Sequence, residues 1–224
     1  MATFKVQIED ITGAVGDDSA LTQWLTDGAK EIINILPPKL KEKCVTATGV
    51  GTDFKVDLDG LGEILYVTRE NADSGFLVPC REIPSMYGGL AFSGSGHMMY
   101  EPSVTDPVYW IDGDTSGAST LYVKPTPTAN QPAIVHHVKY PANSATWGDS
   151  ANALPTVSTS IPNFPDEAEN LVVLYAAIKA TEYMLLTEED MEVYGPQLQT
   201  LKQDYKQGIE MLIGQGSAPA GGGK

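Results

Sequence analysis

Apolar residues toward the C-terminal end of the chain recur at helical spacing and predict two helices between residues 166 and 213. The run from Leu171 to Ile178 is apolar on almost every side, which is typical of a helix that is covered on several faces. From Tyr194 the apolar positions alternate steps of four and three, which places one narrow stripe on one helix face. An acidic stretch at residues 187–190 separates the two runs. We therefore expect an antiparallel helical hairpin with a short turn.

The start of this hairpin also carries helix signals. Asp166 follows Pro165 and is expected to cap the first free backbone N–H groups. Glu167 and Glu169 then fall in the first turn, where the helix dipole favours negative charge. We expect the first helix of the hairpin to begin here.

A second helical pattern lies near the N-terminus. Residues Asp17 to Ser19 offer capping side chains, and Pro37 with Pro38 ends the pattern. Residues 1–16 are short and mixed, and we expect them to form an arm or an edge strand. The N-terminal helix should complete a three-helix layer with the hairpin. Its apolar positions fall three or four apart: Leu21, Trp24, Leu25, Gly28, Ala29, Ile32 and Leu36.

Between these helical regions the pattern changes to alternation, which is typical of strands. Turn residues at 112–117 separate two of the strands and predict a hairpin. Five or six strands at this spacing indicate a small antiparallel sheet or sandwich. The Gly- and Ser-rich segment 84–101 is expected to be a long loop. The candidate strands lie at 54–58, 63–69, 75–80, 108–111, 120–124 and 133–140.

The predicted fold class is α+β, with a helical core formed by the N-terminal helix and the C-terminal hairpin, and an antiparallel β domain inserted between them. Residues 141–165 contain no clear element and are expected to be an extended linker. Residues 214–224 are rich in Gly, Ala, Ser and Pro and predict a flexible tail. The expected divisions are 1–43 (arm and helix), 44–140 (β domain), 141–165 (linker), 166–213 (hairpin) and 214–224 (tail).

Charge and composition narrow the class of function. The net charge is -15, which argues against tight non-specific binding of nucleic acid and against adhesion to an anionic membrane surface. We expect no transmembrane helix and no signal peptide, because the required apolar runs are missing. The two cysteines, Cys44 and Cys80, are expected to be buried free thiols.

The sequence shows no nucleophile motif and no phosphate-binding loop, so we predict no enzyme activity, no catalytic residue, no cofactor and no metal. Adjacent His136 and His137 would point to opposite faces of a strand, and we expect structural roles for them. Residues 112–117 imitate the first half of a calcium loop, but Val123 stands where the bidentate Glu belongs. The glycines at 94–96 predict a flexible loop. The acidic cluster at 188–190 is either a solvated turn or a contact for a basic partner.

Aromatic residues on the predicted strands leave two interpretations open. They could form a platform for a sugar, or they could be core residues of the β domain, since alternation on strands explains both equally well. The residues concerned are Tyr100, Tyr109, Trp110 and Tyr122.

The layout resembles the head–tail adaptor (connector, or neck) proteins of tailed bacteriophages. Three segments carry the resemblance: the N-terminal helix at 21–33, the hairpin at 109–125 and the segment at 161–179, together about half of the chain. The resemblance implies a virion structural protein in the neck, made in the host cytoplasm. It implies a homo-oligomeric ring, commonly a dodecamer, that docks under the portal protein, extends the DNA channel and gives a platform for tail or nozzle proteins. Viral DNA would pass without specific binding, and no membrane partner is expected.

Two other readings stay open: another virion structural protein, such as a tail terminator or tail-tube component, and a carbohydrate-binding β-domain protein. For the adaptor reading we expect the apolar helices to be shared between copies, because heterologous contacts that close by rotation form rings. We also expect residues 207–224 to insert into a partner. The candidate interface residues are Leu171, Leu174, Tyr175, Ile178, Leu198, Leu201, Tyr205 and Leu212.

Overall fold

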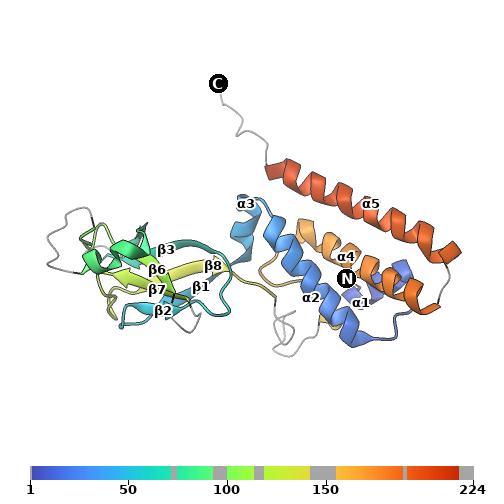
Figure 1. The fold of residues 1–224 in the computed structure, drawn as a ribbon, viewed down its shortest axis with the longest axis horizontal. Coiled ribbons are helices and arrows are strands. Elements are labelled where there is room, and N and C mark those ends of the chain that lie inside the picture. The colour runs from blue at the N-terminus through green and yellow to red at the C-terminus, as the bar shows by residue number, and fades with distance from the viewer. Residues whose placement is uncertain are drawn as a thin grey trace, which may run out of the picture. The chain divides into compact units, whose positions relative to one another are not determined.

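The computed structural model describes residues 2–71, 75–92, 100–113, 119–141, 155–188 and 191–216. The chain divides into two compact units (Figure 1): a helical unit, Met1–Cys44 with Tyr140–Lys224, and a β unit, Val45–Lys139. The expected α+β fold is confirmed, since helices from both ends of the chain form one unit and mainly antiparallel strands form the other.

The helical unit is organised around α4. Three other helices, α1, α2 and α5, pack against it, and Figure 1 shows α4 between α2 and α5. Most of the apolar run at 171–178 is buried, and only Leu174 and Tyr175 keep partial exposure. Each large side chain buried in this way contributes about 1.5–3 kcal/mol relative to an exposed one. The elements are α1 (Phe4–Thr12), α2 (Asp18–Ile35), α3 (Pro38–Lys41), η1 (Glu42–Cys44), η3 (Pro155–Val157), α4 (Asp166–Glu188) and α5 (Met191–Gly216).

Helix α2 follows the sequence prediction. The carboxylate of Asp17 accepts hydrogen bonds from the backbone N–H groups of Ser19 and Ala20, so it caps the helix as expected. The helix ends at Ile35, just before Pro37 and Pro38. The predicted hairpin is also present as α4 and α5, which pack against each other. Its acidic turn, residues 189–190, lies outside the described residues.

The prediction for the first residues was wrong, because they form the helix α1 rather than an arm or a strand. The side chain of Thr3 accepts a hydrogen bond from the N–H of Val6 and caps this helix. Phe4 and Ile8, four residues apart, are buried on one face. Gly13 follows with φ of 87°, a conformation that suits glycine and ends the helix.

The second correction concerns the expected linker. Residues 142–154 lie outside the described residues, but residues 155–165 pack into the helical unit instead of extending away from it. The carbonyl of Ser158 accepts a hydrogen bond from the N–H of Phe4 at 2.9 Å. The N–H of Ile161 donates to Glu169 of α4 at 2.6 Å. Asp166 is the first residue of α4 rather than the cap before it. The buried residues are Pro155, Thr156, Ser158, Ile161 and Phe164.

The described part of the β unit holds two four-stranded sheets, with orders β1-β8-β3-β4 and β2-β7-β6-β5. The pairings are antiparallel except for β5 with β6. The unit begins and ends on neighbouring strands, because Val45 of β1 lies opposite Val138 of β8. The strands are β1 (Val45–Val50), β2 (Lys55–Asp57), β3 (Ile64–Glu70), β4 (Leu77–Pro79), β5 (Arg81–Glu82), β6 (Val108–Gly113), β7 (Ser119–Lys124) and β8 (Ala133–Val138).

The two sheets share one core, so the β unit is a sandwich, one of the two architectures that the strand spacing left open. The described residues form eight strands rather than the five or six expected. The predicted pairing of β6 with β7 is present from Val108 opposite Lys124 to Gly113 opposite Ser119. The turn residues 114–118 lie outside the described residues. Both cysteines are free and buried, as predicted. The shared core contains Val50, Val67, Cys80, Tyr109, Leu121, Val123, Ala133 and Val135.

The segment expected to be a long loop is partly helical. Residues Ser85–Ala91 form the 3-10 helix η2, and Ala91 packs with Trp110 in a second apolar cluster. This cluster covers the face of β6 that points away from the shared core. Residues 93–99, including the glycines of the expected flexible loop, lie outside the described residues.

Candidate assembly interface

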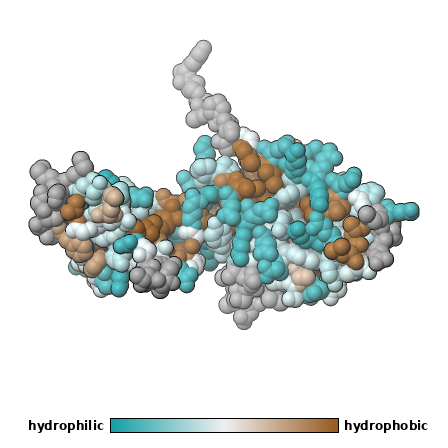
Figure 2. All heavy atoms as spheres, in the orientation of Figure 1, coloured by the Kyte–Doolittle hydropathy of each residue, from teal (hydrophilic) through white to brown (hydrophobic). Residues whose placement is uncertain are grey.

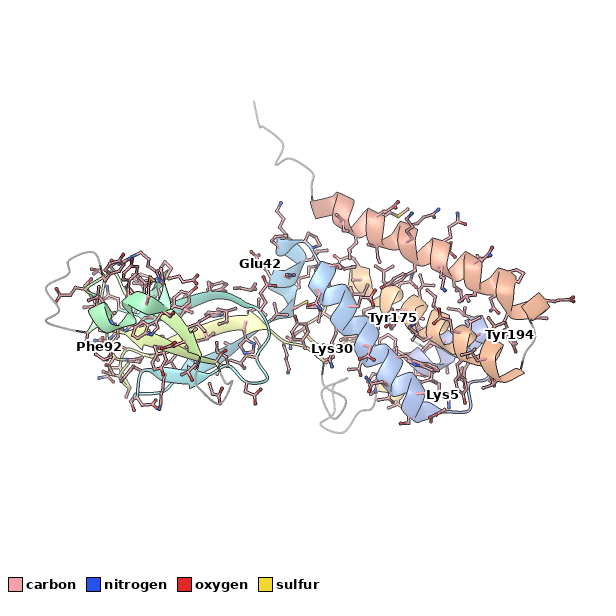
Figure 3. The ribbon with its side chains drawn as sticks, in the orientation of Figure 1. Lys5, Lys30, Glu42, Phe92, Tyr175 and Tyr194 are labelled. Carbon is pink, nitrogen blue, oxygen red and sulfur yellow. The ribbon has the colours of Figure 1, made fainter. Side chains whose placement is uncertain are left out.

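Two glycines set the spacing of the helices around α4. A Cβ added to Gly208 of α5 would collide with the side chain of Leu171 on α4. A Cβ added to Gly28 of α2 would lie 2.8 Å from Cδ1 of Tyr175, which Figure 3 shows on α4 beside α2. The absence of a side chain at both positions lets the neighbouring helices approach α4 closely. Leu171 and Tyr175 are therefore contact points inside the subunit.

The structure divides the eight predicted interface residues into two groups. Leu171, Ile178, Leu201 and Leu212 are each no more than 7% exposed, so they serve the core of their own subunit. The other four keep partial exposure and can also reach a neighbour: Leu174, Tyr175, Leu198 and Tyr205.

A polar network joins α2, α4 and α5 next to these residues. The hydroxyl of Tyr205 donates to Glu31 at 3.0 Å, and its ring lies 6.1 Å from that of Tyr175. Burial, followed by the hydrogen bond to Glu31 and its charge, raises the pKa of Tyr205. The neutral tyrosine therefore persists well into alkaline solution, and the link between α2 and α5 persists with it.

A carboxylate on α4 extends this network. Glu182 pairs with Lys202 of α5 at 2.9 Å and with Lys179 at 3.1 Å. Burial works to raise the pKa of Glu182, but the hydrogen bonds from the two lysines outweigh it, so the pKa is lowered. These ion pairs are partly exposed, and surface ion pairs contribute only about 0–1 kcal/mol to the free energy of unfolding. Their main effect is therefore to fix the register of α5 on α4.

A hollow surface runs along the C-terminal half of α5. It consists of two adjoining hollows of about 330 and 180 Å³, both lined by Asn170, Leu171, Gly208 and Met211. The side chain of Met211 is 67% exposed at its edge, and Ile213 is also exposed. We call the surface of Leu174 and Met211 the groove surface.

A second apolar surface lies at the opposite end of the hairpin. Leu186, near the end of α4, is 80% exposed, and Val193, near the start of α5, is exposed too. Together with Tyr183 we call them the turn-end surface. Figure 2 shows hydrophobic atoms over both ends of the hairpin. One subunit thus carries two different apolar surfaces, which is what a heterologous contact between copies requires.

Comparison with known proteins identifies the family of the chain. The family described as SU10 adaptor protein matches residues 2–222, nearly the whole chain. The chain belongs to this adaptor family. A comparison with curated proteins found no match. Membership makes this protein an adaptor, a structural component of a bacteriophage, in agreement with the resemblance seen in the sequence.

An adaptor family is not normally enzymatic, and the two adjacent histidines have structural explanations. His136 stacks on Tyr66 and bonds Thr68 of β3, whereas His137 bonds Thr48 of β1. The two imidazoles thus link β8 to different neighbouring strands. Within the described residues no group of three His, Cys, Asp or Glu side chains could hold a metal ion. None of the described helices is both long and apolar enough to span a membrane.

Sequence reasoning missed three exposed apolar residues of α4 and α5. Met211, Ile213 and Leu186 lie off the regular stripe, because the stripe marks the residues that face the subunit's own core. The sequence carried no strong signal for them, since single apolar residues on the solvent side of a helix are common. The acidic residues at 189–190 and the tail at 217–224 lie outside the described residues.

Proposed function

We propose that this adaptor forms a closed ring, commonly a dodecamer, that docks under the portal in the neck of the virion. The ring extends the DNA channel and gives a platform for tail or nozzle proteins. One observation carries the proposal: the α4–α5 hairpin presents two separate apolar surfaces, at opposite ends, on a subunit whose core is already complete. A groove surface on one copy and a turn-end surface on the next form a contact that repeats by rotation.

The four partly exposed predicted residues complete this proposed contact. Leu174 lies in the hollow beside Met211. Tyr175, Leu198 and Tyr205 keep accessible atoms on the same two helices. The four buried residues, Leu171, Ile178, Leu201 and Leu212, act indirectly, because they hold the two helices that carry the contact. The proposed interface therefore includes all eight residues, in two roles.

The portal contact is assigned to the C-terminal end of α5 and the residues that follow it, 207–224. The apolar side chain of Ile213, which is exposed near this end and does not line the groove, supports the assignment. The net charge of -15 supports passage of viral DNA without binding, since an acidic wall repels phosphates.

The experiment is to measure the mass of the full-length protein by native mass spectrometry, alone and mixed with purified portal. With portal present, we expect the mass of a ring. If docking drives closure of the ring, we expect mainly single subunits when portal is absent. Met211→Asp should prevent the ring while leaving the thermal unfolding midpoint nearly unchanged. Gln203→Asp, an exposed position on the same helix, adds charge as a matched control and should assemble normally. A protein that stays monomeric with portal present would contradict the proposal.

A further inference from the structure

Four aromatic rings gather on the outer face of the sheet β2-β7-β6-β5. Trp110 of β6 and Tyr122 of β7 lie directly opposite each other, and their rings stack at 5.3 Å. Phe92 meets Trp110 at 6.4 Å and Phe54 at 6.1 Å, both edge to face. The ring centroid of Phe54 lies 6.1 Å from that of Tyr122, so each of the four rings contacts two others. Figure 3 labels Phe92 in the β unit. We call this site the aromatic pocket.

The aromatic pocket encloses a hollow of about 260 Å³. One wall is the backbone of η2, because a Cβ added to Gly88 would lie 2.6 Å from Nε1 of Trp110. Gly89 also lines the hollow, but a Cβ there would meet nothing within 4 Å. Pockets for drug-sized ligands measure about 300–1,000 Å³, so this hollow suits a ligand of one ring.

Charges at the pocket select among such ligands. The ammonium of Lys124 lies 3.7 Å from the centroid of Phe54 and 4.6 Å from that of Phe92. This cation already uses the faces that would attract another one, and it would repel a cationic ligand. The exposed carboxylate of Asp112 lines the hollow and would repel an anion. A neutral ligand is repelled by neither charge.

The polar groups define the rest of its chemistry. Asp112 offers an acceptor, and the exposed hydroxyl of Ser85 can donate or accept. Phe92, Phe54 and Tyr122 keep exposed ring surface that can contact C–H groups, whereas Trp110 is buried beneath them. A ligand with an apolar face and hydroxyl groups at its edge satisfies both. We propose that the aromatic pocket binds a single neutral pyranose ring of a carbohydrate chain. This site is independent of the proposed ring assembly, which uses the helical unit.

The sequence had suggested a different set of aromatic residues for a sugar platform. Trp110 and Tyr122 belong to the pocket, but Tyr109 points into the shared core and donates a hydrogen bond to Glu82. Tyr100 instead stacks on Tyr87 at 4.6 Å. Phe54 and Phe92 replace them, and neither lies within a strand.

The test follows the indole N–H resonance of Trp110 in the full-length protein, assigned with Trp24→Phe and Trp147→Phe variants. The probes are methyl glycosides of glucose, galactose, mannose and N-acetylglucosamine. We expect at least one of them to shift this resonance in a saturable way. Tetramethylammonium and inorganic phosphate, added separately, should leave it unchanged.

Two variants and one control make the assignment specific. Asp112→Ala should weaken binding roughly tenfold, the effect of losing a hydrogen bond to a charged group. Gly89→Leu should abolish binding by filling the hollow, with an unchanged unfolding midpoint. Asp59→Ala, an exposed aspartate of the same unit outside the pocket, should bind as the parent does. No shift with any glycoside, a response to the ions alone, or undiminished binding by Gly89→Leu would each overturn the proposal.

Discussion

The helical unit and the β unit achieve close packing by different means. In the helical unit two glycines let backbones approach α4, and the largest fully buried side chains are all apolar. In the β unit a buried guanidinium, that of Arg69, lies among apolar residues and bonds Gln131 at 2.7 Å. The helical unit should therefore be sensitive to added volume and charge, and the β unit to the loss of a polar partner.

The largest expected effect is a charge in the centre of the helical unit. Leu171→Asp places a carboxylate at a buried position between α4 and α5 and should destabilise the protein by about 4 kcal/mol. Thermal unfolding followed by circular dichroism measures this. Leu186→Asp is the matched control: it should barely change the unfolding midpoint but should impair ring formation with portal. Equal loss of stability in both variants would contradict the division between core and turn-end surface.

The second-largest expected effect is the loss of a polar partner inside the β unit. Gln131→Leu removes the closest acceptor of the Arg69 guanidinium, whose Nε has no partner in the described structure, and should cost about 2 kcal/mol in urea unfolding. The double variant Arg69→Met with Gln131→Leu should recover much of this loss, because neither polar group is then left alone. Additive losses in the double-mutant cycle would show that the pair is not coupled.

A smaller effect comes from one methyl group between α2 and α4. Gly28→Ala should destabilise the protein by about 1–2 kcal/mol, since crowding against Tyr175 outweighs the gain in helix propensity. Gly195→Ala adds the same methyl group to α5 where a Cβ meets nothing within 4 Å, and should be neutral or stabilising. Differential scanning calorimetry on the two variants decides whether close approach, rather than glycine itself, matters.

The smallest effect concerns alkaline pH. Burial, followed by the hydrogen bond and the charge of Glu82, raises the pKa of Tyr109 to about 12, above its ordinary value of 10.0. Folding thus favours the protonated tyrosine, so its contribution is complete below pH 10.0 and disappears as the pH rises through about 12. Tyr109→Phe should flatten this decline in urea unfolding measured from pH 8 upward. An identical slope in the variant would show that Tyr109 does not cause it.

Local signals in the sequence predicted the parts of the fold that depend on near neighbours. The cap at Asp17, the stop at Pro37 and the alternation on β6 and β7 each act over a few residues, and each appears as expected. Helix α1 was missed because it has only nine residues and its apolar positions are interrupted by charged ones. Residues 155–165 were missed because burial of a Pro- and Ser-rich segment depends on partners far along the chain, such as Phe4.

The proposed interface could be predicted only in part for a related reason. An apolar stripe shows that a helix face is covered, but not whether the cover belongs to the same chain. Leu171 and Leu212 are covered by their own subunit, whereas Leu174 is only partly covered. Met211 lies outside the stripe, and it can be recognised as part of an exposed surface only when the positions of the neighbouring helices are known. The aromatic pocket likewise depends on Phe54 and Phe92, which only the folded chain brings beside Trp110.

The pairing of Val45 with Val138 has an evolutionary consequence. Because the chain leaves and re-enters the helical unit through two adjacent strands, about 5 Å apart, a short turn could bridge the same gap. A deletion or replacement of the whole sandwich at these two strands could therefore leave the ends of the helical unit at their original separation. Such an exchange would change the β unit in one step and leave the residues of the helical unit unaltered.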